Sequence, residues 1–69
     1  MPSITIQLNG DAFEVPAGET VSSLLERLKR DARTVAVEHN GEIVRRDQYA
    51  EARIEAGDRL EIVAFVQGG

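Results

Sequence analysis

The sequence predicts an α+β domain in which one main helix packs on one face of a mixed sheet of four to five strands. Two Asn-Gly pairs, at positions 9–10 and 40–41, are each flanked by alternating apolar residues, which is the pattern of a β-hairpin. Only residues 20–30 carry apolar residues at helical spacing, and the last segment alternates again like a strand. Because one helix can cover only one face of a sheet, we expect the other face to meet solvent or a partner.

The first hairpin is predicted for residues 3–15. Its apolar residues alternate with polar ones on both strands: Ile4, Ile6, Leu8, Phe13 and Val15. Asn9-Gly10 lies between the strands, and both residue types tolerate the positive φ angles of a tight turn. Pro16 and Gly18 then end the hairpin.

The helix is predicted to start after Thr20, whose hydroxyl can accept a hydrogen bond from an unpaired N–H group of the first turn. Its apolar stripe occupies positions i, i+3, i+4 and i+7: Val21, Leu24, Leu25 and Leu28. The stripe predicts a helix that ends near Arg30 and turns its leucines toward the sheet.

Strand patterns return around the second Asn-Gly pair. Val35 and Val37 alternate before it, and Ile43-Val44 follows it, so a second hairpin is expected. Residues 45–58 are less regular, and Tyr49 and Ile54 are the residues there that we expect to reach the core.

The last predicted strand has two different faces. Leu60, Ile62, Ala64 and Val66 share one face, and Glu61, Val63 and Phe65 share the other. If this strand lies beside the first in the middle of the sheet, residues 1–66 form a β-grasp domain and residues 67–69 form a flexible tail. Val63 and Phe65 would then lie on the open face as a candidate docking patch for partner proteins, or as ordinary exposed apolar residues.

Composition argues against several classes of function. Acidic residues outnumber basic ones by 12 to 8, which disfavours nucleic acid as a partner. The chain has no cysteine and one histidine, so we expect no metal site. Ser22 and Ser23 lie at the start of the predicted helix and are interpreted as polar helix residues, so we expect no nucleophile and base pair that would indicate an enzyme. No run approaches the roughly 18 apolar residues of a membrane span, and the start does not resemble a secretory signal. We therefore expect a cytoplasmic protein without a membrane role and without a bound cofactor.

The sequence ends on Gln67, Gly68 and Gly69, directly after the last predicted strand. Either the glycines are a frayed end, or the terminal carboxylate is the reactive group. An enzyme that activates this carboxylate with ATP must admit the chain end to a narrow channel, and glycine allows a close approach of backbone. Three residues span about 10 Å at most, enough to enter a pocket while the folded body stays outside.

Residues 37–69 resemble the ThiS-type sulfur carriers of thiamine biosynthesis, and the resemblance covers nearly the whole chain in length, order of elements and ending. The matching positions are Asn40, Ile43-Val44, Arg46, an aromatic residue at Tyr49, Gly57-Asp58 and Gly68-Gly69. The resemblance implies a ubiquitin-like β-grasp fold whose Gly69 carboxylate is adenylated, converted to a thiocarboxylate and used to give sulfur for thiazole formation. It also implies two partners, a ThiF/E1-like adenylating enzyme that uses ATP and a ThiG-like thiazole synthase.

The chain departs from the family pattern at Arg45, where the family often has proline, and at Tyr49, where it often has tryptophan. Three alternatives stay open. The chain could be the small subunit of molybdopterin synthase, a ubiquitin-like modifier whose tail forms an isopeptide bond, or a β-grasp interaction module in which the glycines are incidental.

Overall fold

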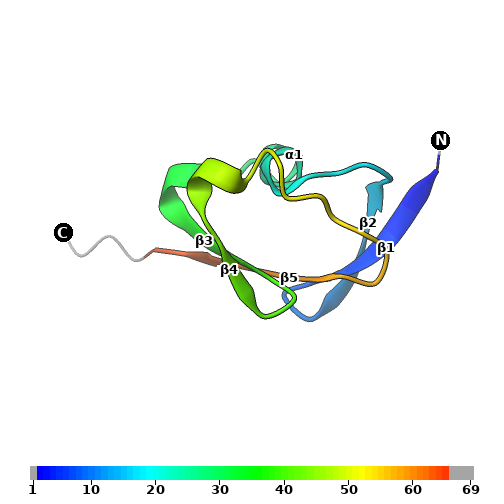
Figure 1. Ribbon diagram of the computed structural model, residues 1–69. Helices are drawn as coiled ribbons and strands as arrows, with labels where there is room; N and C mark the ends of the chain where they lie inside the picture. Colours follow the sequence, from blue (N-terminus) through cyan, green and yellow to red (C-terminus); the bar gives the residue numbers. More distant parts are fainter. Residues whose placement is uncertain (1, 66–69) are drawn as a thin grey trace.

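A computed structural model describes residues 2–65 as a five-stranded sheet with one α-helix against one of its faces (Figure 1). The elements are β1 (Ser3–Leu8), β2 (Asp11–Pro16), α1 (Val21–Arg27), β3 (Val35–His39), β4 (Glu42–Val44) and β5 (Arg59–Ala64), with short 3-10 helices at Ala32–Thr34 and Arg46–Gln48. The predicted order of elements and both hairpins are confirmed.

The last strand lies in the middle of the sheet. The strand order is β2-β1-β5-β3-β4, and β5 runs parallel to β1 and antiparallel to β3. This is the predicted β-grasp arrangement. Leu60 and Ile62 are buried under α1, whereas Arg59, Glu61 and Val63 are exposed on the open face.

The core fills the space between the sheet, α1 and the connector from β4 to β5. Its buried apolar residues are Ile6, Val15, Val21, Leu24, Leu25, Val35, Val37, Tyr49, Ile54, Leu60 and Ile62. The predicted stripe of α1 is therefore the face that it buries, with Leu28 packed at the edge. Tyr49 and Ile54 are buried, as predicted.

A reciprocal capping box opens α1. The Ser23 N–H donates to Thr20 Oγ1 at 3.1 Å, and the Thr20 N–H donates to Ser23 Oγ at 2.9 Å. The predicted N-cap is thus confirmed. The connector satisfies the neighbouring donors, because the N–H of Val21 donates to the Ala52 carbonyl oxygen at 3.0 Å.

The helix ends at Arg27, before the end near Arg30 that its stripe predicted. The reason is the backbone of Lys29, which has a φ of 58° and cannot continue a right-handed helix. The N–H groups of Lys29 and Arg30 donate back to the carbonyl oxygens of Glu26 and Leu25 at 3.1 and 2.9 Å, as in a Schellman motif.

Glu19 is a buried carboxylate beside the start of the helix. Its side chain is 5% exposed, and Arg27 Nε donates to its Oε2 at 2.8 Å. The hydrogen bond from Arg27 lowers the pKa of Glu19, although burial acts in the opposite direction.

We expect Glu19→Gln to lower the free energy of unfolding at pH 7 by about 1–2 kcal/mol, since Arg27 is partly solvated and the pair is partly screened. Because the folded-state pKa of Glu19 is lowered, its contribution is present above the ordinary carboxyl pKa of about 4 and is lost as the pH falls through the lowered value. Urea denaturation at pH 7 and pH 3 checks this. An equal difference between wild type and variant at both pH values would contradict it.

Candidate functional site

The residues expected to carry the chemistry, Gln67, Gly68 and Gly69, lie outside the described residues. The strand that leads toward them is β5, which runs to the side of the molecule opposite the N-terminus (Figure 1). Beyond β5, the Phe65 N–H still donates to the Thr34 carbonyl oxygen at 2.8 Å. The backbone is therefore held to the sheet as far as Phe65.

The side chain of Asn9, in the first Asn-Gly turn, hydrogen-bonds to the backbone of β5. Asn9 adopts a φ of 51°, which directs its side chain toward the central strand. The Ile62 N–H donates to Asn9 Oδ1 at 2.8 Å, and Asn9 Nδ2 donates to the Ile62 carbonyl oxygen at 3.3 Å. The amide thus pairs with β5 as a peptide unit would, after β1 has ended at Leu8.

The side chain of Asn40, in the second Asn-Gly turn, hydrogen-bonds to the start of β5 from the other side. The Arg59 N–H donates to Asn40 Oδ1 at 2.8 Å, and Asn40 Nδ2 donates to Asp58 Oδ1 at 3.2 Å. Asp58 Oδ2 lies 2.7 Å from His39 Nε2 and accepts from the Glu55 N–H at 2.8 Å. Burial acts to raise the pKa of Asp58, but these hydrogen bonds outweigh it and lower the pKa.

We expect Asn9→Gly to lower the free energy of unfolding by about 1–3 kcal/mol, because the turn keeps its positive φ but the backbone of Ile62 loses both partners. Asn9→Ala adds about 1–2 kcal/mol of left-handed backbone strain. Urea denaturation gives the energies, and hydrogen exchange at the Ile62 amide shows whether the local bond is lost. An unchanged exchange rate of the Ile62 amide in Asn9→Gly would contradict the hydrogen bond between Asn9 and Ile62.

The open face carries the exposed large apolar side chains of the described chain. Val63 is 61% exposed and Phe65 is 50% exposed, which confirms the predicted exposure, while docking through them stays a prediction. Ile43, at 67%, was not predicted as part of this surface. The signal was present, because a turn of two residues at positions 40–41 pairs Ile43 with Glu38 and so puts Ile43 on the open face.

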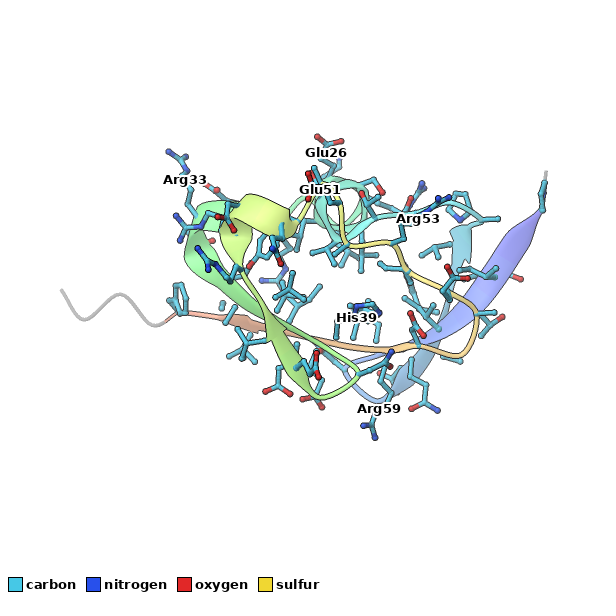
Figure 2. All side chains as sticks on the ribbon, viewed as in Figure 1. Glu26, Arg33, His39, Glu51, Arg53 and Arg59 are labelled. Atoms are coloured by element: carbon cyan, nitrogen blue, oxygen red, sulfur yellow. The ribbon has the colours of Figure 1, made fainter. Side chains whose placement is uncertain are left out.

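Figure 2 separates the two sides of the molecule. Glu26 and Glu51 lie on the helix side, whereas Arg59 points away from the sheet on the opposite side. A hollow of about 160 Å³ on the open face is lined by Glu38, Gly41, Arg59 and Glu61. It is smaller than pockets that enclose small-molecule ligands, which measure about 300–1,000 Å³.

Within residues 2–65, no three His, Cys, Asp or Glu side chains are grouped as metal ligands would be. His39 instead bonds to Asp58. The same part of the chain contains no helix with the length and apolar character needed to span a membrane.

Comparison with known proteins points to one family. The sequence model of the ThiS family matches residues 6–69. The sulfur carrier protein ThiS of Escherichia coli is 34% identical over 64 residues, which cover 93% of this chain and 97% of that protein. A crystal structure of the thiamine biosynthesis protein ThiS from Geobacter metallireducens superimposes with a TM-score of 0.81 at 33% identity, covering 96% of this chain and 100% of that one.

Two much longer proteins are also similar. A thiazole synthase of Paramagnetospirillum magneticum is 48% identical over 62 residues, and one of Magnetococcus marinus is 38% identical over 64 residues. The chain spans only 19% and 20% of their respective lengths. Each of these thiazole synthases therefore contains a segment similar to nearly the whole of this chain.

Proposed function

The chain belongs to the ThiS family, and from this premise we propose that it is a sulfur carrier protein for thiazole formation in thiamine biosynthesis. In this proposal the Gly69 carboxylate attacks the α-phosphate of ATP, and pyrophosphate leaves. Sulfide then attacks the acyl-adenylate and displaces AMP, which leaves a thiocarboxylate on Gly69. The chain binds no cofactor, since ATP is bound by the adenylating partner.

The proposal is supported chiefly by the match to the ThiS family model, which extends to Gly69. The similarity to the E. coli carrier, at 34% identity, also covers 97% of that protein. The segments within two thiazole synthases support a thiazole synthase as the partner that accepts the sulfur. The adenylating partner, of ThiF/E1-like type, follows from the chemistry, because a carboxylate must be activated before sulfur can replace one of its oxygens.

The fold suits a carrier that is a substrate of its partners rather than an enzyme. The side chains of Asn9 and Asn40 hydrogen-bond to the central strand from its two sides. The folded domain can therefore be bound as a rigid body while residues 67–69 enter the active site of a partner. The exposed side chains of Val63, Phe65 and Ile43 offer apolar area on the open face to which a partner can dock. Since activation consumes ATP, the proposal includes a cytoplasmic location.

Reconstitution tests the proposal. The purified chain is incubated with the adenylating enzyme of its source organism, ATP and sulfide, and its intact mass is measured. We expect the gain of one oxygen replaced by sulfur, and no gain when ATP is omitted. Conjugates to lysine side chains would instead indicate a ubiquitin-like modifier, and an unchanged mass would indicate an interaction module.

A further inference from the structure

Two glutamate residues are neighbours on the open face of the sheet. Glu38 on β3 and Glu61 on β5 are direct partners in the antiparallel register. Side chains at such positions have Cβ atoms about 4.5–5.5 Å apart, and like charges there are destabilising. Glu61 is exposed and Glu38 is half-buried, so the repulsion is only partly screened by water.

Nothing in residues 2–65 neutralises this pair by direct contact. The ion pairs of the described chain involve Glu19, Asp31, Asp47 and Asp58, and neither Glu38 nor Glu61 takes part in one. Arg59 lines the same hollow, but its side chain points away from the sheet (Figure 2). The hollow therefore keeps two carboxylates against one cation.

Exposed apolar side chains flank this charged hollow. Ile43 lies beside Glu38 in the register of β3 and β4, and Val63 follows Glu61 on the same face of β5. At Gly41, which also lines the hollow, an added Cβ would meet no atom within 4 Å. A long cationic side chain can thus enter between the carboxylates while apolar neighbours pack on Ile43 and Val63.

We propose that the Glu38/Glu61 pair receives an arginine side chain of the thiazole synthase, presented within an apolar patch of that protein. This proposal rests on the carrier function proposed above and names the chemistry of its docking surface. A guanidinium presents several N–H donors in a planar fork and can bond to two carboxylates at once. Partner binding would relieve the like-charge repulsion that the free chain leaves in place.

The charges on this face disfavour two other occupants. A second copy of the chain docked face to face would bring four carboxylates together, and nucleic acid would bring phosphates against them. A cationic protein surface with apolar character satisfies both the carboxylates and the exposed side chains of Ile43 and Val63.

The test is the affinity of the unmodified chain for purified thiazole synthase of the source organism, measured by calorimetry at low and high salt. We expect the double variant Glu38→Gln, Glu61→Gln to raise Kd at least about tenfold at low salt, with a smaller effect at high salt. Its thermal stability should equal or exceed that of wild type, because the repulsion is removed.

The matched control is Glu26→Gln, Glu51→Gln, which removes the same charge from the helix side (Figure 2). We expect it to change Kd by less than about twofold, apart from weak long-range steering. Equal effects of the two double variants, or no measurable binding by wild type, would overturn the proposal. Because binding is measured without sulfur loading, a failure of the carrier chemistry would appear separately, in the mass of the chain.

Discussion

One glycine added after Gly69 is expected to abolish sulfur transfer while leaving the fold unchanged. The addition moves the terminal carboxylate by up to about 3.5 Å along the chain. Displacing reacting atoms by even about 1 Å can slow an enzymatic step about 100-fold, so we expect at least that loss in the rate of thiocarboxylate formation. The measurement is the rate of mass gain with adenylating enzyme, ATP and sulfide.

The matched control carries the same glycine before Met1, at the other end of the chain. It has the same mass and composition as the extended variant, and we expect it to take up sulfur at the wild-type rate. Sulfur uptake by the C-terminally extended chain at that rate would refute the role of the Gly69 carboxylate.

The second large effect is expected from Leu60→Ala on the central strand. Leu60 is fully buried between the sheet and α1, so its truncation leaves a cavity and should lower the free energy of unfolding by about 2–5 kcal/mol. Small domains have a total of only about 5–15 kcal/mol, so a substantial part of the stability is lost. Urea denaturation followed by circular dichroism measures it.

Val63→Ala is the control from the opposite face of the same strand. Because Val63 is 61% exposed, we expect a change in stability within about 0.5 kcal/mol and weaker binding of thiazole synthase. Equal destabilisation by the two substitutions would contradict the assignment of the two faces of β5.

Patterns along the chain predicted the fold well where local chemistry and burial agree. Each Asn-Gly pair requires positive φ at both residues, which few other pairs tolerate, and both pairs form the expected turns. The stripe through Val21, Leu24 and Leu25 is buried because it has the period of a helix. The end of α1 was missed because a lysine, rather than glycine, adopts the left-handed conformation at position 29.

The candidate site was predicted less completely. Alternation along the last strand was enough to predict that Val63 and Phe65 are exposed. Predicting the exposure of Ile43 also required the register of the second hairpin. The hydrogen bonds from the side chains of Asn9 and Asn40 to β5 join residues far apart in sequence. The neighbouring glutamates Glu38 and Glu61 are also far apart in sequence. Such contacts depend on strand order, which local periodicity does not contain.

The most direct measurement is tandem mass spectrometry of the C-terminal peptide, isolated from the source organism while it synthesises thiamine. We expect a peptide that ends at Gly69 and carries sulfur in place of one carboxylate oxygen on that residue. Sulfur found at another position, or a Gly69 that continues into further residues in every isolated molecule, would contradict it.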